Sequence, residues 1–247
     1  MSVQSDLKRI TVSSLKKMKS NGEKIASLTA YDAGFSAVLD AAGVDVILVG
    51  DSLGMVIQGH ETTIPVTVDD MIYHSKAVAS RCQRALLMVD MPFMSYTSLG
   101  QAMDTAAALM REGAAHMVKL EGDARQVDTV SKLSEHGVPV CAHIGLQPQL
   151  VHKLGGYRVQ GRDAKAATAM LKDAHELEQA GADLMLLECV PDILAAEITA
   201  NLNIPVIGIG ASAKCDGQIL VLHDILGITP GRVPRFAHNF LQGRESI

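Results

Sequence analysis

The sequence predicts an α/β fold, a single (β/α)₈ TIM barrel, and three observations carry that prediction. The chain has 247 residues, which is the ordinary size of one such barrel. Short runs rich in Val, Ile and Leu recur, and each precedes a longer stretch with helical spacing, as in parallel strands covered by helices. No Pro-rich linker or change of composition divides the chain. We therefore expect residues 1–247 to form one barrel domain with a short N-terminal helical extension.

The apolar runs give the expected strands in chain order. They are Lys24–Ala30, Asp45–Gly50, Ala85–Asp90, His116–Glu121, Val138–His143, Leu184–Glu188 and Pro205–Ile209, with a weak eighth near Arg235–Ala237. Helical spacing predicts the helices Ala33–Ala42, Val68–Cys82, Ser98–Glu112, Ala124–Glu135, Ala164–Ala180, Asp192–Leu202 and Asp216–Leu226. Seven clear strand-helix units and a weaker eighth favour a closed barrel, although periodicity alone does not exclude an open doubly wound sheet.

Four of the expected helix-to-strand joints share one pattern. Gly43, Gly113, Gly137 and Gly181 each follow the last turn of a predicted helix, in the strings AAGVD, EGAAH, EHGVP and QAGAD. A left-handed residue commonly ends a helix at this position, and glycine adopts that conformation without strain. The pattern therefore predicts four left-handed glycine caps.

Composition and charge exclude several classes of protein. Hydrophobic residues make up 48% of the chain and charged residues 20%, a balance typical of a globular domain. The formal charge of −5 gives no reason to expect a nucleic-acid partner. Neither a signal-peptide core nor an apolar run of about 18 residues occurs, so we expect a cytoplasmic protein without a membrane span. The four cysteines lack the spacing of a zinc site.

Titratable side chains stand where the apolar runs end. The active sites of (β/α)₈ barrels lie at the carboxyl ends of the strands, so these side chains should converge. They are Asp51, followed by Ser52, and then Asp90, Lys119, Glu121, His143 and Glu188. Taken singly, each has a simpler explanation: an aspartate can cap the next helix, a histidine can be a satisfied core residue, and Lys119 can merely pair with Glu121. Their equivalent places on five strands favour a site.

Three of the carboxylates come from successive strands. Asp51, Asp90 and Glu121 follow the second, third and fourth strands, and neighbouring strands lie about 5 Å apart. Oxygen ligands select Mg²⁺ or a similar hard cation. A 2-keto acid can fill the open positions of such an ion, which would polarise its carbonyl group.

The two remaining charged groups suit proton transfer and charge stabilisation. Glu188 lies on the sixth strand, away from the three carboxylates, and its apolar neighbours should raise its pKa, as suits a general base. Lys119 stands two residues before Glu121, on the same side of the strand, where it could face an enolate or a substrate carboxylate.

Long strings of the chain resemble the ketopantoate hydroxymethyltransferase family. They include LTAYD, VGDSLGMVIQGHETTIPVT, DMPFMSY, MVKLEG, CAHIGLQPQ, GGYRVQGR, LLECVP, IPVIGIGA and RFAHNF, in the family's order from about Thr29 to Phe240. The resemblance implies a barrel of the phosphoenolpyruvate/pyruvate type that uses Mg²⁺. It also implies transfer of a hydroxymethyl group from 5,10-methylenetetrahydrofolate to 3-methyl-2-oxobutanoate, giving ketopantoate for pantothenate biosynthesis.

By the same resemblance, each motif residue has an expected role. The metal site would include Asp51, Asp90 and Glu121. The keto acid would be held by Asp51, Ser52, Asp90 and Lys119. Glu188 would accept the proton, and His143 would lie in the active-site mouth, with its role open. The resemblance further implies a large homo-oligomer, commonly a decamer. Two alternatives stay open: another Mg²⁺-dependent keto-acid barrel, of the isocitrate lyase or phosphoenolpyruvate mutase type, and a non-catalytic ligand-binding barrel.

Overall fold

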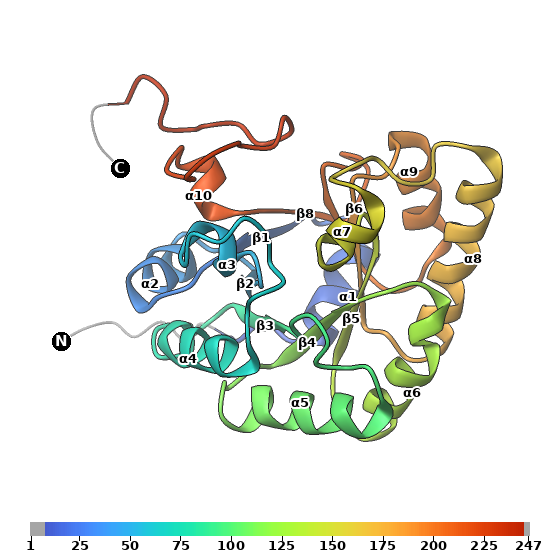
Figure 1. The fold of residues 1–247 in the computed structure, drawn as a ribbon, viewed down its shortest axis with the longest axis horizontal. Helices are drawn as coiled ribbons and strands as arrows, with labels where there is room; N and C mark the ends of the chain where they lie inside the picture. The colour runs from blue at the N-terminus through green and yellow to red at the C-terminus, as the bar shows by residue number, and fades with distance from the viewer. Residues whose placement is uncertain (1–7, 245–247) are drawn as a thin grey trace.

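The computed structural model describes residues 8–244 and shows a closed barrel of parallel strands (Figure 1). Every strand pairs with its neighbours in the sequence, and β1 closes the barrel against β8. The strands are β1 Ile25–Thr29, β2 Val46–Val49, β3 Leu86–Asp90, β4 Met117–Glu121, β5 Val140–Gly145, β6 Leu184–Glu188, β7 Val206–Ile209 and β8 Gly217–Leu220. The predicted fold class is confirmed, and the open sheet is excluded.

Helices surround the barrel and separate successive strands along the chain, except β7 and β8, which a loop joins (Figure 1). They are α1 Val12–Asn21, α2 Ala33–Ala41, α3 Leu53–Val56, α4 Val68–Ala79, α5 Leu99–Arg111, η1 Ala124–Gln126, α6 Val127–Glu135, η2 Pro148–Leu150, α7 Val151–Leu154, α8 Ala164–Gln179, α9 Asp192–Asn201 and α10 Leu222–Ile225. Six of the predicted helices agree with these bounds within a few residues. The short α3, α7 and η2 lie in loops at the carboxyl ends of the strands.

The prediction for the last strand-helix unit is wrong. Residues 235–237 form a turn rather than a strand, and the eighth strand is Gly217–Leu220, inside the stretch predicted as a helix. Its residues pair with β1 and β7, and they alternate between buried and more exposed positions. The apolar spacing of residues 216–226 suits a helix locally, but the barrel closes only if this segment supplies the last parallel strand.

Three of the four predicted glycine caps are left-handed, and the fourth differs. Gly43, Gly137 and Gly181 have φ values of 85°, 79° and 105°. After α5 the left-handed residue is Ala114, with φ 57°, and not Gly113. A Cβ atom on Gly113 would lie 2.6 Å from the Leu109 carbonyl oxygen. Glycine is needed there for close approach of the backbone, so the left-handed turn falls one residue later.

Alternating side chains divide the interior into two layers. One set points into the barrel and forms a small core with Leu15 of α1, which lies among the inward residues of the strands. The other set points outward and packs under the surrounding helices in a larger core. On β4, Met117 belongs to the inner core while Val118 and Leu120 belong to the outer one. The period of two along a strand therefore decides which residues at its carboxyl end face the barrel axis.

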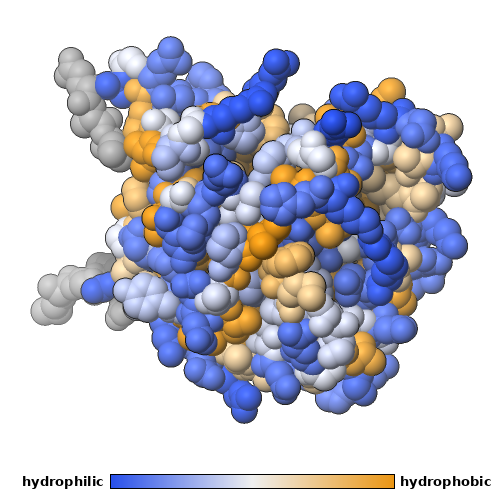
Figure 2. Space-filling model, in the orientation of Figure 1, coloured by the Kyte–Doolittle hydropathy of each residue, from blue (hydrophilic) through white to orange (hydrophobic). Residues whose placement is uncertain are grey.

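The face of the molecule seen in Figure 2 is mainly hydrophilic, with hydrophobic residues in small separate areas. Within residues 8–244, the structure contains no helix that combines the length and the apolar character needed to cross a bilayer.

Candidate active site

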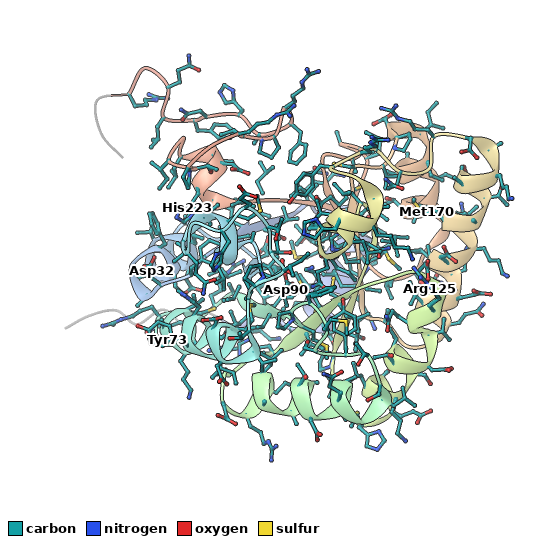
Figure 3. The ribbon with its side chains drawn as sticks, viewed as in Figure 1. Asp32, Tyr73, Asp90, Arg125, Met170 and His223 are labelled. Carbon is teal, nitrogen blue, oxygen red and sulfur yellow. The ribbon has the colours of Figure 1, made fainter. Side chains whose placement is uncertain are left out.

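The predicted site residues share the inward side of their strands. Asp90 follows the inward residue Met88 by two positions, Lys119 and Glu121 continue from Met117, His143 follows Cys141, and Glu188 follows Leu186. The register then places them beside one another, since Asp90 is paired with Lys119 and Glu121 with His143. Figure 3 shows Asp90 near the middle of the barrel. The predicted convergence of these strand ends is confirmed.

Asp51 and Asp90 contact each other directly. The backbone N–H of Asp51 donates to Asp90 Oδ2 at 2.9 Å, and both side chains are buried. Gly50 leaves room for the neighbouring Ser52 hydroxyl, because a Cβ atom there would lie 2.9 Å from Ser52 Oγ. Neither aspartate side chain caps a helix in the described structure, so capping does not explain them.

Lys119 is the cation of this group. Its Nζ lies 3.1 Å from Asp90 Oδ1, and the side chain is only 4% exposed. Burial lowers the pKa of Lys119, but the charges of Asp90, Glu121 and Asp51 outweigh burial and raise it above its ordinary value. Lys119 therefore stays charged, and its partner is Asp90 rather than the Glu121 suggested by sequence spacing.

Gln149 is a residue of the site that the sequence did not single out. Its side-chain Nε2 donates to Asp51 Oδ2 at 2.9 Å, and its backbone N–H donates to Glu121 Oε2 at 3.0 Å. The hydroxyl of Tyr96 donates to Gln149 Oε1 at 2.6 Å. The signal that could have found Gln149 is its position in CAHIGLQPQ, four residues after a strand that carries a titratable residue.

Tyr31 supports Ser52 in a similar way. The two hydroxyl oxygens are 2.8 Å apart, and the Tyr31 side chain is buried. Burial raises the pKa of Tyr31 above its ordinary value, so the phenol is neutral and can donate to Ser52. Tyr31 lies two residues after β1 in LTAYD, and this place near a strand end was its sequence signal.

His143 lies between Lys119 and Glu188. Its Nδ1 is 3.2 Å from Lys119 Nζ, and its Nε2 is 3.4 Å from Glu188 Oε2. Burial, together with the charge of Lys119, lowers the pKa of His143 well below its ordinary value, so the ring is neutral. Because an ammonium group only donates, Nδ1 accepts, and the ring proton is on Nε2, toward Glu188.

Three carboxyl groups of the site, those of Asp51, Glu121 and Glu188, have raised pKa values. Burial raises the pKa of Glu188 to about 7, and burial followed by the charge of Asp90 raises the pKa of Asp51 to about 7. Burial also raises the pKa of Glu121 well above its ordinary value. Together with Asp90, these residues bring four carboxyl groups around the single ammonium group of Lys119. A divalent cation would offset this excess of potential negative charge.

Free oxygens of these carboxylates fit a hard cation. Glu121 Oε1 is buried and makes no hydrogen bond, and Asp90 Oδ1 faces the Lys119 ammonium group at 3.1 Å without a further hydrogen bond. The second oxygen of each carboxylate accepts a backbone N–H. Between residues 8 and 244, no three His, Cys, Asp or Glu side chains form a ready-made metal cage. Mg²⁺ keeps several waters and needs only one or two carboxylates, so the donor set still fits it.

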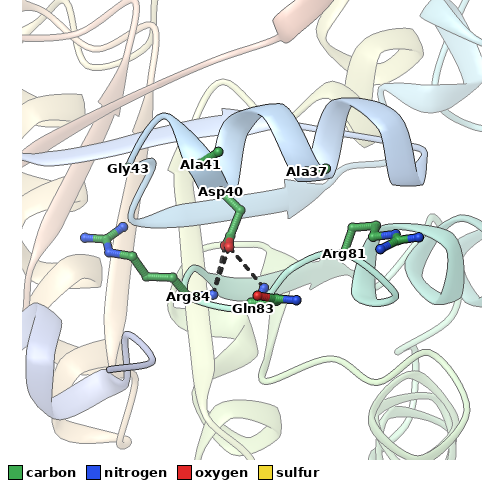
Figure 4. A pocket seen from close by; sticks show the side chains of 7 residues that line it. All are labelled: Ala37, Asp40, Ala41, Gly43, Arg81, Gln83 and Arg84. Atoms are coloured by element: carbon green, nitrogen blue, oxygen red, sulfur yellow. Dashed lines mark hydrogen bonds between the residues drawn. The ribbon is translucent and has the colours of Figure 1, made fainter. Parts of the chain in front are cut away.

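The described residues enclose two hollows, one beside the site and one outside it. One of about 200 Å³ borders Glu121 and Gln149 and is walled by residues that include Phe93 and Tyr96. The other, of about 410 Å³, is lined by Ala37, Asp40, Ala41, Gly43, Arg81, Gln83 and Arg84 between α2 and the loop after α4 (Figure 4). There Asp40 accepts the backbone N–H groups of Gln83, Arg84 and Ala85, so its charge is already used in holding the loop.

Comparison with known proteins agrees with the resemblance in the motifs. Residues 9–247 match the ketopantoate hydroxymethyltransferase family. A 3-methyl-2-oxobutanoate hydroxymethyltransferase of Alkalilimnicola ehrlichii is 61% identical over 238 residues, covering 96% of this chain and 86% of that protein. The corresponding enzyme of Marinobacter nauticus is 60% identical and covers 96% and 90%.

Solved structures share the fold at low identity. A 2,3-dimethylmalate lyase, described as a member of the PEP mutase/isocitrate lyase superfamily, superposes with a TM-score of 0.62 at 16% identity, over 87% of this chain and 82% of that one. This likeness agrees with the (β/α)₈ barrel fold. The family match extends over nearly the whole chain, at high identity to its relatives, and we conclude that the chain belongs to the ketopantoate hydroxymethyltransferase family.

Proposed function

We propose that the protein transfers a hydroxymethyl group from 5,10-methylenetetrahydrofolate to 3-methyl-2-oxobutanoate, giving ketopantoate for pantothenate biosynthesis. The reaction requires removal of a proton from C3 of the keto acid before the new carbon–carbon bond forms. The observation that carries the proposal is the meeting of Asp51, Asp90, Lys119, Glu121 and Glu188 at the carboxyl ends of the strands, with the buried Glu121 Oε1 free of hydrogen bonds among them.

Mg²⁺ is the proposed cofactor, and Asp51, Asp90 and Glu121 would hold it directly or through water. Bound there, the ion supplies Lewis-acid polarisation of the keto group. The protein residues do the rest: they hold the substrate, place the base and balance charge.

The substrate-binding residues offer complementary groups to a keto acid. Lys119 presents a buried positive charge to the substrate carboxylate or to the charge that develops on the enolate. Ser52, whose hydroxyl is fixed by Tyr31, offers a hydrogen-bond donor beside it. Asp51 and Asp90 complete the proposed binding set.

Glu188 is the proposed base. Its side chain is 15% exposed, and it faces the Nε2 proton of neutral His143. Burial raises its pKa to about 7, which is suited to accepting a proton near neutral pH. His143 would then orient the carboxylate of Glu188. This is a role for His143, which the sequence left open.

Proton–deuterium exchange at C3 of 3-methyl-2-oxobutanoate tests this function. Exchange that requires Mg²⁺ but not folate, followed by ketopantoate formation when folate is added, would support both half-reactions. Exchange followed by cleavage or rearrangement of another keto acid would favour the isocitrate lyase or phosphoenolpyruvate mutase type of enzyme. Ligand binding without exchange would identify a non-catalytic barrel.

Removal of Asp90 should abolish the metal dependence of exchange. Loss of a residue that only supports a metal ligand typically costs 10-fold to 100-fold in affinity, so Asp90→Ala should weaken Mg²⁺ binding by about 100-fold or more. Titration of Mg²⁺ against the exchange rate measures this change. The control is Asp192→Ala, which removes a carboxylate outside the site that accepts a hydrogen bond from the Ser212 hydroxyl. The proposed metal site would be contradicted if Asp90→Ala exchanged at the parent rate, or if a chelator left the exchange rate of the parent protein unchanged.

The exchange rate should rise with pH and level off above about pH 7. Only ionised Glu188 accepts a proton, and its raised pKa of about 7 leaves most of the base protonated at lower pH. Initial rates measured from about pH 5 to about pH 9 at saturating Mg²⁺ test this sign. A rate that is flat, or that falls across this range, would exclude Glu188 as the base.

The same proposal includes a cytoplasmic location and assembly into a homodecamer or another large homo-oligomer. Val38, Tyr73 and Ile193 are large apolar side chains on the outer helices, and they are more than half exposed. Burial of such side chains between subunits would stabilise an assembly. Sedimentation equilibrium of the purified protein measures its mass directly.

A further inference from the structure

We infer that Gln149 is a positioning residue that holds the two outer carboxylates of the proposed metal site, Asp51 and Glu121, in place. This inference rests on the metal site proposed above. It assigns a role to a residue in the loop after β5 that is not itself proposed to bind the ion or the keto acid.

Gln149 joins the ends of several strands. It lies in η2, and its side chain is only 4% exposed. Its side-chain amide donates to Asp51 Oδ2, after β2, and at 3.0 Å to the Met91 carbonyl oxygen, after β3. Its backbone N–H donates to Glu121 Oε2, at the end of β4. The residue therefore connects the loop after β5 with the ends of β2, β3 and β4.

The amide of Gln149 has a single favourable orientation. Its nitrogen faces two acceptors, the Asp51 carboxylate and the Met91 carbonyl, and both of its hydrogens are used. Its oxygen accepts from the Tyr96 hydroxyl at 2.6 Å. A rotation of the amide by 180° would place oxygen against oxygen at Asp51 and Met91. Tyr96 thus fixes Gln149, and Gln149 fixes Asp51.

The hydrogen bonds leave one oxygen of each carboxylate for another ligand. Gln149 occupies Oδ2 of Asp51 and Oε2 of Glu121. Glu121 Oε1 is buried without a hydrogen bond, and no hydrogen bond to Asp51 Oδ1 occurs among the described residues. Donors that bind one oxygen of a carboxylate restrict its rotation, so the free oxygens are held before a cation arrives. This preorganisation should be visible in metal affinity.

The test is the affinity of the full-length protein for Mn²⁺, a probe for the Mg²⁺ site, measured by calorimetric titration. Gln149→Met keeps the length of the side chain but removes the donor to Asp51, so the affinity should fall about 10-fold to 100-fold. The Mg²⁺ concentration for half-maximal exchange should rise by a similar factor, while the rate at saturating Mg²⁺ stays within a few-fold of the parent. A residue that acted only on the stability of the fold would lower the melting temperature without this change in affinity.

Gln147→Met is the matched control, because Gln147 lies in the same loop and its side chain makes no hydrogen bond in the described structure. Its Mn²⁺ affinity should equal that of the parent. Parent-like affinity in folded Gln149→Met would overturn the inference. If that variant does not fold, Tyr96→Phe replaces it, since it removes the hydroxyl that donates to the amide oxygen at 2.6 Å, along with that hydroxyl's longer contacts of 3.3 Å to the Glu121 backbone. A several-fold loss in Tyr96→Phe supports the inference, and unchanged affinity overturns it. Absence of Mn²⁺ binding in the parent protein would instead reject the metal site itself.

Discussion

Glu188→Gln should reduce deuterium exchange at C3 of 3-methyl-2-oxobutanoate by about 10²-fold to 10⁴-fold, the usual effect of losing a general base. Glutamine keeps the size of the side chain and can still face His143 Nε2, which lies 3.4 Å from the Glu188 carboxylate in the parent. It has no oxygen that can accept a proton near neutral pH. The barrel should therefore fold, and the keto acid should still bind. Nuclear magnetic resonance of the C3 proton measures exchange, and calorimetry measures binding.

The control for Glu188→Gln is Glu135→Gln, which makes the same chemical change on the exposed end of α6. It should exchange at the parent rate. If Glu188→Gln also exchanges at the parent rate but no longer forms ketopantoate, Glu188 acts in the folate half-reaction. His143, whose neutral ring adjoins Glu188, would then be the better candidate for the base.

Lys119→Met should lower the free energy of unfolding by about 3–5 kcal/mol, because it leaves the buried Asp90 carboxylate without its ion-pair partner. The Lys119 and Asp90 side chains are 4% and 3% exposed, so water cannot replace the lost charge. Urea denaturation at pH 8 without Mg²⁺ measures the change. In protein that remains folded, use of the keto acid should weaken far more than binding of folate, since Lys119 is proposed to face the keto acid.

Two further variants separate the cost of a buried, unpaired charge from the cost of losing an ion pair at the surface. Lys16→Met removes an exposed partner of Asp183, at 3.0 Å, and should change the free energy of unfolding by less than about 1 kcal/mol. Lys119→Met combined with Asp90→Asn removes both charges and should recover much of the lost stability. An effect of Lys119→Met as small as that of Lys16→Met would show that the buried pair is not strongly coupled.

The sequence by itself predicted the alternation of strands and helices and the convergence of five titratable residues at the strand ends. The period of two along each apolar run, ending in a titratable residue, predicts that Asp90, Lys119, Glu121, His143 and Glu188 face one region, and the strand pairing places them so. These features are local, because side chains alternate along any strand and the carboxyl ends of parallel strands meet at one end of a barrel.

Only the tertiary structure decided the pairing within the site and the closure of the barrel. Lys119 pairs with Asp90 across two strands, not with Glu121 on its own strand, because the register of β3 and β4 sets that distance. Gln149 is an ordinary amide in the sequence and becomes central only when its loop folds over β2 and β4. Residues 217–220 have helical spacing locally, yet they form β8, since pairing with β1 and β7 satisfies backbone groups that an open edge would leave free.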